Sequence, residues 1–235
     1  KKFAAYYYNK GEEWGYPVAI NYKHDAFMFG TAVPDVERGQ FAEMKPYFWQ
    51  TDTAVGRDSW CYTPDNRYKS PREIVQDLVD IVSKNGNLLL NVGPKADGSI
   101  PDEDRQFLLA IGDWLRVNGD AIYGTSYWRI YGEGPTEVKE GHFTDGAAKT
   151  FTGEDIRFTV QGSTLYATVL VFPEDGVVTI KSLKEKSTHF CGIIQEIQIL
   201  GFNEQPTWER NEDGLTIRTT NVSSPMPVVF KLEIE

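Results

Sequence analysis

The stretch Pro34 to Gly39, PDVERG, places two carboxylates two residues apart in a segment with strand-like character. Successive side chains of a strand point to opposite faces, so Asp35 and Glu37 share one face while Val36 takes the other. A carboxylic acid of raised pKa can act as general acid and base in glycoside cleavage. If this face lines the C-terminal mouth of a barrel, both carboxylates meet a substrate cleft. An exposed edge strand with solvated charges explains the pattern equally well.

Glycoside cleavage needs a second carboxylate about 5 to 9 Å from the first. Asp25, Asp52 and Asp58 lie in the same part of the chain and are candidates for that second group. Their spacing in the sequence does not select one of them.

Aromatic and polar residues are concentrated in the segments Tyr47–Asp52 and Ser59–Tyr62. A single aromatic residue more often packs in the core than binds a ligand. Trp60, however, follows Arg57, Asp58 and Ser59 in a polar loop, and an indole ring gains by covering an apolar sugar face. We therefore expect Trp60 to be a platform for a sugar.

The three histidines, His24, His142 and His189, stand alone, without the spacing of metal ligands. Each is expected to be structural, with His24 the best candidate for an exception. The loop from Gly93 to Gly98 lacks the residue order of a phosphate-binding loop. The sequence predicts neither a metal site nor a cofactor, and no Ser-His-Asp or Cys-His arrangement.

The composition limits the classes of partner. The chain has 235 residues, a formal net charge of -10 and a pI of about 4.9, so it has no basic surface for nucleic acid. It has no apolar run near the roughly 18 residues that a membrane span needs, and no membrane partner is expected. Cys61 and Cys191 are far apart and are expected to be free and buried.

The first half of the chain alternates strands and helices. Ser70-Pro71-Arg72-Glu73 has the order of a capping box and predicts the start of a helix. A second helix is expected over 102–117. Residues 1–14 resemble, more weakly, the last part of a helix, which is expected to end near Lys10-Gly11. Strands are expected over 18–21, 35–38, 47–52 and 88–92. This alternation predicts a parallel sheet, and the unbroken run Leu88-Leu89-Leu90 is typical of a strand covered on both faces.

After residue 124 the pattern becomes a series of short apolar runs separated by Gly, Pro or Asp. Such a series predicts an antiparallel β-sandwich. We therefore divide the chain into an α/β domain over 1–126 and an all-β domain over 127–235. The expected strands of the second domain are 156–160, 165–171, 177–180, 194–200, 215–219 and 228–234.

Several motifs together resemble one family. They are FAAYYYN at 3–9, VPDVERG at 33–39, FWQTDTAV at 48–55, SWCY at 59–62 and NGNLLLNVGP at 85–94. In this combination they resemble the α-L-fucosidases of glycoside hydrolase family 29, densely over residues 1 to about 125 and loosely over the sandwich.

The resemblance implies a retaining exo-glycosidase that removes terminal α-L-fucose from glycans by double displacement. It implies a (β/α)8-like, TIM-type barrel, of which this chain would carry the C-terminal half, followed by the sandwich. By motif position Glu37 matches the general acid/base, with Glu43 as the nearest rival. Trp60 matches an aromatic near the fucose pocket, and we expect His24, Asp35 and Arg38 to bind substrate as well.

In the family the nucleophilic aspartate lies before the helix that matches FAAYYYN, so here it is expected upstream of Lys1. The missing N-terminal half of the barrel would then be a partner, and the chain alone would be inactive. The resemblance implies a periplasmic, secreted or lysosomal location. Two alternatives stay open: a carbohydrate-binding or domain-bridging protein without catalysis, and a barrel glycosidase for another sugar, such as galactose.

Overall fold

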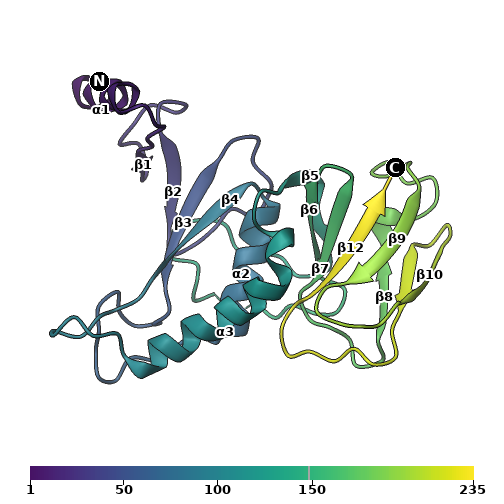
Figure 1. Cartoon of the computed structure of the whole chain (residues 1–235). Coiled ribbons are helices and arrows are strands. Elements are labelled where there is room, and N and C mark those ends of the chain that lie inside the picture. Colours follow the sequence, from purple (N-terminus) through teal and green to yellow (C-terminus); the bar gives the residue numbers. More distant parts are fainter. Residues whose placement is uncertain (148) are drawn as a thin grey trace.

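The computed structural model describes residues 1–147 and 149–235. It contains a parallel sheet with helices, followed by two antiparallel sheets that face each other (Figure 1). No helix among the described residues is long and apolar enough to cross a membrane.

The first sheet has the order β1-β2-β3-β4, and each neighbouring pair is parallel, as predicted. Strands that follow one another in sequence are therefore neighbours in space, and their C-terminal ends lie at one edge of the sheet. The elements of this part are α1 (Lys2–Trp14), β1 (Asn21–Tyr22), β2 (Val33–Glu37), β3 (Trp49–Ala54), α2 (Pro71–Ser83), β4 (Gly86–Asn91), α3 (Asp102–Asn118) and the short 3-10 helix η1 (Gly119–Ala121).

Helix α2 begins as the sequence predicts. The Ser70 hydroxyl accepts a hydrogen bond from the Glu73 backbone N–H at 3.1 Å, and the Glu73 carboxylate accepts one from the Ser70 N–H at 2.7 Å. This capping box satisfies two backbone donors that the first turn would otherwise leave unpaired.

Helix α1 does not end at Lys10-Gly11 but continues to Trp14, with Gly15 in the left-handed conformation as its cap. Gly11 has a different reason to be a glycine. A Cβ atom there would lie 2.6 Å from a methyl group of Val18, so the position needs close packing rather than a turn. The prediction of the helix end was wrong because sequence cannot separate these two uses of glycine.

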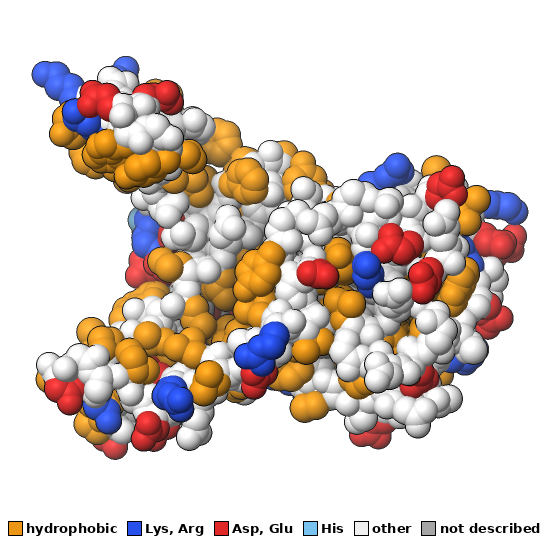
Figure 2. All heavy atoms as spheres, viewed as in Figure 1, with side chains coloured by type: hydrophobic (Ala, Val, Ile, Leu, Met, Phe, Trp, Pro, Cys, Tyr) orange, Lys and Arg blue, Asp and Glu red, His pale blue; other side chains and the backbone are white. Residues whose placement is uncertain are grey.

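Strand β4 is covered on one face only. Leu88 and Leu90 pack against the cluster formed with α2 and α3, whereas Leu89 points to the other face and is 55% exposed. The expectation that both faces of this strand are covered is thus wrong for the described residues. Figure 2 shows that the molecule is hollowed between α1 and the lower loops, with hydrophobic side chains around the hollow.

The second part is a β-sandwich, as predicted. One sheet has the order β5-β6-β7-β12-β9 and the other β10-β11-β8, with antiparallel neighbours throughout. The elements are β5 (Ser126–Glu133), β6 (Ile156–Gln161), β7 (Thr164–Val169), β8 (Val177–Ile180), the 3-10 helix η2 (Lys181–Leu183), β9 (Ile194–Ile199), β10 (Thr207–Arg210), β11 (Leu215–Arg218) and β12 (Val228–Ile234).

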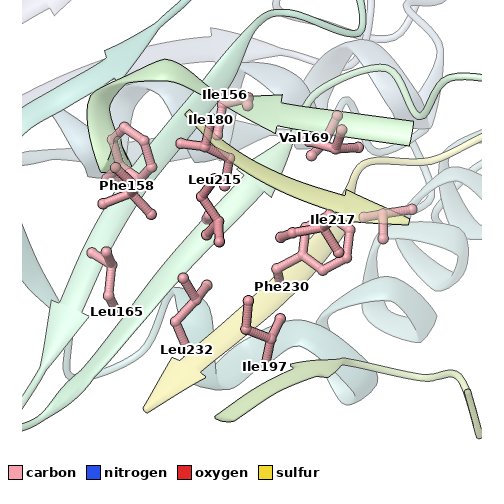
Figure 3. Packing of buried hydrophobic residues seen from close by; sticks show 14 of the residues in the cluster. Ile156, Phe158, Leu165, Val169, Ile180, Ile197, Leu215, Ile217, Phe230 and Leu232 are labelled. Atoms are coloured by element: carbon pink, nitrogen blue, oxygen red, sulfur yellow. The ribbon is translucent and has the colours of Figure 1, made fainter. Parts of the chain in front are cut away.

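The two sandwich sheets bury their apolar side chains against each other (Figure 3). Ile156 and Phe158 of β6, Ile217 of β11 and Phe230 of β12 are fully buried there. Alternation of apolar and polar residues along these strands produces this one-sided burial. Two strands were not predicted: β5, at the junction between the two parts, and β10, whose residues Thr207–Arg210 are mostly exposed.

A buried charge cluster joins the two parts of the molecule. We call Asp80, Lys84 and Arg157 the Asp80 cluster. The Asp80 carboxylate lies 2.6 Å from the Lys84 ammonium and 2.5 Å from the Arg157 guanidinium of β6. Burial alone would raise the pKa of Asp80, but the charges and hydrogen bonds of its two partners lower it. Helix α2 therefore packs between the parallel sheet and the sandwich, and one buried carboxylate binds two cations at the contact.

Candidate functional site

A group of charged side chains lies at the C-terminal edge of the parallel sheet. Lys23 follows β1, and its ammonium lies 2.5 Å from an oxygen of Asp35 and 2.8 Å from one of Asp52. The nearest Glu37 oxygen is 3.8 Å away. We call these four residues the Lys23 cluster. Because Lys23 reaches both Asp35 and Glu37, these two side chains share a face, and Val36 packs on the other with Trp49 and Ile81. This confirms the predicted alternation.

The pairing of the strands explains why these residues meet. Asp35 lies opposite Gln50, and Glu37 lies opposite Asp52, in the register of β2 and β3. The Gln50 amide donates to the second oxygen of Asp35 at 2.5 Å. Parallel pairing thus brings carboxylates from two strands, separated by a long loop, into one row.

Lys23 is held in its charged form. Partial burial alone would lower the pKa of Lys23, but hydrogen bonds to Asp35 and Asp52 raise it above the ordinary value of 10.5. A positive charge therefore stands beside three carboxylates.

Glu37 differs from its two carboxylate neighbours. Both oxygens of Asp35 accept hydrogen bonds, and its side chain is only 4% exposed. Both oxygens of Asp52 are also engaged, one by Lys23 and the other by the Arg38 backbone N–H at 3.2 Å. The Glu37 side chain is 27% exposed, and within the described part of the chain its carboxylate accepts no hydrogen bond. Glu37 is therefore the carboxylate of the cluster that is free to meet a ligand.

The backbone around Glu37 is strained at three points. His24, Arg38 and Phe143 have φ angles of 54°, 46° and 57°, in the left-handed region that residues with a Cβ atom rarely adopt. Such conformations persist where surrounding contacts determine them, and they gather at functional sites.

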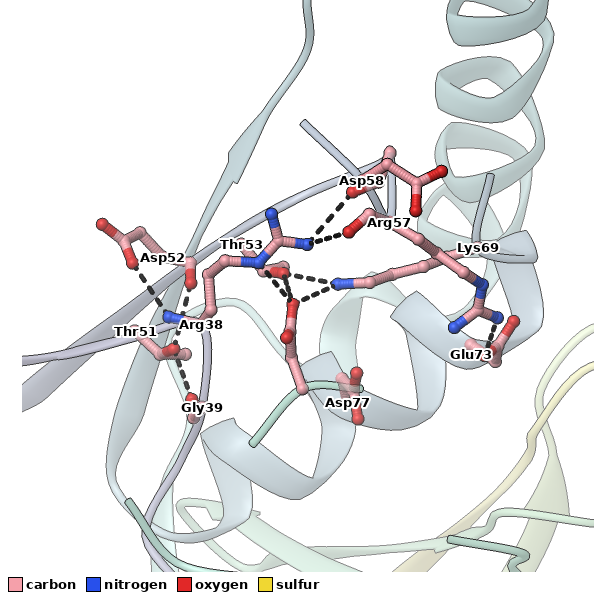
Figure 4. Close-up of polar contacts among 12 residues, drawn as sticks. Arg38, Gly39, Thr51, Asp52, Thr53, Arg57, Asp58, Lys69, Glu73 and Asp77 are labelled. Carbon is pink, nitrogen blue, oxygen red and sulfur yellow. Dashed lines mark hydrogen bonds and ion pairs between the residues drawn. The ribbon is translucent and has the colours of Figure 1, made fainter. Parts of the chain in front are cut away.

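Arg38 connects Glu37 to the aromatic loop. Its guanidinium donates to the carbonyl groups of Gly56 and Arg57 at 3.2 and 3.1 Å, and it lies 5.0 Å from the centre of the Trp60 ring. Figure 4 shows Arg38 reaching from the end of β2 toward Arg57. One face of the Trp60 ring is thus covered by a cation, which fixes the indole beside the site.

A segment of the sandwich reaches this edge of the parallel sheet. The Glu37 backbone N–H donates to Nδ1 of His142 at 3.0 Å, and the His142 ring lies 4.4 Å from the ring of His24, between centroids. The expectation of isolated histidines was wrong for this pair. The two lie more than a hundred residues apart in sequence, and only the fold brings them together.

Asp145, from the same segment, is bound by three side chains. Its Oδ2 atom lies 2.7 Å from the Lys69 ammonium, 2.7 Å from the Thr53 hydroxyl and 3.1 Å from Nε of Arg38. Arg38, Thr53 and Lys69 converge in this way in Figure 4. Burial alone would raise the pKa of Asp145, but hydrogen bonds from Lys69 and Thr53 lower it.

The other candidates from the sequence lie outside this cluster. Asp58 pairs with Arg67, whose hydrogen bonds lower the pKa of Asp58 to about 2. Asp25 and Glu43 are exposed. Cys61 and Cys191 are also exposed, so the expectation that they are buried was wrong.

The substrate contacts predicted for Trp60, His24, Asp35 and Arg38 stay predictions. The sequence reasoning did not select Lys23, Gln50 or Asp145. The polar stretch NYK after a short apolar run was the available signal for Lys23, because it places a cation at a strand end. The described residues contain no group of three or more His, Cys, Asp or Glu that could hold a metal ion.

Comparisons with known proteins assign these features to a family. The family model for alpha-L-fucosidase matches residues 1–120, and the model for the alpha-L-fucosidase C-terminal domain matches residues 149–235. Tissue alpha-L-fucosidase of Mus musculus is 34% identical over 187 residues, which is 77% of this chain and 36% of the relative. The human tissue enzyme is 32% identical over 192 residues, or 80% of this chain and 36% of the relative.

Among solved structures, the Thermotoga maritima alpha-fucosidase in complex with fucose superposes with a TM-score of 0.70 at 29% identity. The match covers 97% of this chain and 47% of that one. The chain spans about a third of the length of the curated relatives it matches. The matching models cover both the parallel sheet with its carboxylates and the sandwich, and the chain therefore belongs to the alpha-L-fucosidase family, glycoside hydrolase family 29.

Proposed function

We propose that this chain supplies the acid/base side of a retaining α-L-fucosidase that removes terminal fucose from glycans. The observation that carries the proposal is the position of Glu37. It stands at the C-terminal edge of a parallel sheet, partly exposed and free of hydrogen bonds within the described residues, beside carboxylates that are fully engaged. Family membership and the names of the relatives support the choice of fucose.

Glu37 acts twice in the proposed reaction. In the first step its carboxylic acid donates a proton to the glycosidic oxygen while the bond from that oxygen to C1 of fucose breaks, and a nucleophilic carboxylate bonds to C1. In the second step the Glu37 carboxylate takes a proton from a water molecule. The resulting hydroxide bonds to C1 and displaces the nucleophile. Fucose is released with its original configuration.

The nucleophile is proposed to be an aspartate in the N-terminal half of the barrel, outside this sequence. The engaged oxygens of Asp35 and Asp52 support this assignment, since neither carboxylate is free to attack C1. Lys23 holds both in place. Asp35 and Arg38, which we predicted to contact substrate, also make contacts that position other residues of the site. Asp35 fixes Lys23, and Arg38 fixes the ring of Trp60.

We also propose that residues 1–126 form the C-terminal half of a (β/α)8-like barrel and that residues 127–235 form the sandwich domain. The sequential parallel order of the four strands supports a barrel. The open face of β4 at Leu89 and the exposed rings of Phe3 and Tyr6 on α1 suit burial against further barrel elements. The fucose site would lie at the mouth, between Glu37, Trp60 and His24.

The proposal predicts how Glu37→Ala changes hydrolysis by the complete protein that contains this sequence. Fucosides with poor leaving groups, such as fucosyl disaccharides, should be cleaved about 100- to 10,000-fold more slowly, because they need the proton. A nitrophenyl fucoside, whose leaving group departs without a proton, should lose far less in its first step. The two kcat/KM values are measured by product release.

Glu43→Ala is the matched control, because Glu43 is exposed, close in sequence and outside the Lys23 cluster. It should leave both rates near the wild-type values. Equal losses on both substrates after Glu37→Ala would remove Glu37 from the acid/base role. Binding of fucosylated glycans by the complete protein without any hydrolysis would contradict the enzyme and support a carbohydrate-binding protein.

A further inference from the structure

The connection between β5 and β6 of the sandwich contributes a segment to the edge of the parallel sheet, next to Glu37. The backbone N–H groups of Gly141, Phe143 and Asp145 donate to the carbonyl groups of Gln40, Glu37 and Arg38 at 3.0, 2.8 and 2.8 Å. The segment 140–145 therefore lies along the chain that follows β2.

The contact is close enough to determine residue type. A Cβ atom at Gly39 would lie 1.9 Å from the carbonyl oxygen of Gly141, so only glycine allows the two backbones to approach. At one end of the segment, Glu140 accepts a hydrogen bond from the Ala42 N–H at 2.9 Å. At the other end, Asp145 is held by Lys69, Thr53 and Arg38. The position of the segment is thus fixed at both ends and along its length.

Phe143 is the residue of this segment that is not explained by packing. Its backbone N–H is bonded directly to the Glu37 carbonyl, yet its side chain is 66% exposed. Its φ angle of 57° is unfavourable for a residue with a Cβ atom. Strain in the backbone, together with a ring held in solvent on a residue whose N–H bonds to the Glu37 backbone, indicates a role in ligand contact.

The chemistry of the site defines which part of the ligand would meet this ring. A general acid must stand beside the glycosidic oxygen, so the group that leaves lies on the side of the acid. The hydrogen bond from the Phe143 N–H to the Glu37 carbonyl makes Phe143 a direct backbone neighbour of the residue that carries the acid. A phenyl ring exposed to solvent can stack on the apolar face of a sugar ring.

We propose that Phe143 is the stacking platform for the sugar that leaves, so that the sandwich domain contributes the leaving-group subsite. This inference rests on the proposed function, because it takes Glu37 as the general acid. It makes the β5–β6 connection a determinant of which fucosylated glycans are cleaved, while fucose itself is bound by other residues.

The test uses the complete protein and the variant Phe143→Asn. Asparagine tolerates the left-handed backbone conformation, so the ring is removed without added strain. Two substrates are compared: a fucosyl disaccharide, and α-L-fucosyl fluoride, whose leaving group is a single atom that reaches no subsite. The ratio of kcat/KM for the disaccharide to kcat/KM for the fluoride should fall about tenfold. Phe143→Gly, which also suits this backbone, should give the same fall.

Ile193→Ala is the matched control, since Ile193 is an apolar residue of the sandwich that is 64% exposed and precedes β9 at the far edge of the sheet from β5. It should leave the ratio unchanged. An unchanged ratio in both Phe143 variants, including equal losses on the two substrates, would overturn the subsite. Because the fluoride needs no proton, absence of fluoride hydrolysis by the wild-type protein would instead contradict the proposed function.

Discussion

The Asp80 cluster and the Lys23 cluster are built from the same kinds of groups but differ in closure and in charge balance. In the Asp80 cluster one carboxylate meets two cations, and all three side chains are 0–3% exposed. In the Lys23 cluster one ammonium meets three carboxylates, whose exposure rises from 4% at Asp35 to 27% at Glu37.

This difference separates a structural use of charge from a chemical one. A buried group with every partner in place stabilises one arrangement of α2 against the sandwich, and it has no capacity left for a ligand. A cluster with more carboxylates than cations leaves one of them unbound. Glu37 is that group. Asp35 and Asp52 accept hydrogen bonds from Lys23, whereas Glu37 lies beyond hydrogen-bond distance of it.

The largest effect expected from this comparison is on stability. Asp80→Asn removes the one carboxylate between Lys84 and Arg157 and leaves two buried cations uncompensated, so the free energy of unfolding should fall by about 3–5 kcal/mol. Urea unfolding followed by circular dichroism measures the change. Asp113→Asn, which breaks an exposed pair with Arg116 on α3, is the control and should change stability by less than about 0.5 kcal/mol. A loss below about 1 kcal/mol for Asp80→Asn would contradict the structural role.

A smaller loss of stability is expected in the Lys23 cluster. Lys23→Met removes the partner of the buried Asp35 carboxylate but leaves the Gln50 amide in place, and water reaches the remaining carboxylates. The free energy of unfolding should fall by about 1–3 kcal/mol.

A double-mutant cycle with Asp35→Asn provides the control for Lys23→Met. In the Asp35→Asn background the added effect of Lys23→Met should shrink, since the buried negative charge is already gone. An effect of Lys23→Met as large as that of Asp80→Asn would erase the distinction between the two clusters.

The sequence predicts the local features of the fold well. The capping box at Ser70 and Glu73 depends on residues three apart, and the strands of the sandwich show apolar runs bounded by turns. Strand β10 was missed because an exposed edge strand has no apolar face to show a pattern. Leu89 was expected to be buried because the sequence of a leucine run does not show whether another element covers both faces of the strand.

The candidate site was predictable only in part, for the same physical reason. Period-two alternation places Asp35 and Glu37 on one face, and this is a property of β2 alone. Their contact with Lys23 depends on the register of three strands, and the contacts of His142 and Asp145 depend on how the sandwich docks on the sheet. Groups that meet across such distances in sequence leave no local pattern from which they could be predicted.

The smallest effect concerns Asp145. It is intermediate between the two clusters, because it is partly buried and its Oδ2 atom pairs with both Arg38 and Lys69. Its pKa is lowered in the folded protein, so its contribution to stability is present above the unfolded pKa of about 3.9 and is lost as the pH falls through the folded pKa. Asp145→Asn should therefore reduce the free energy of unfolding by about 1 kcal/mol at pH 7.

Below about pH 4 the difference between wild type and Asp145→Asn should shrink, because the wild-type carboxyl also becomes neutral. Urea unfolding at a series of pH values measures it, and Asp113→Asn again serves as control. A difference that stays constant from pH 7 into this range would show that the charge of Asp145 does not hold the segment 140–145. The leaving-group subsite would then need another anchor, since Asp145 is the residue that ties Phe143 to both Lys69 and Arg38.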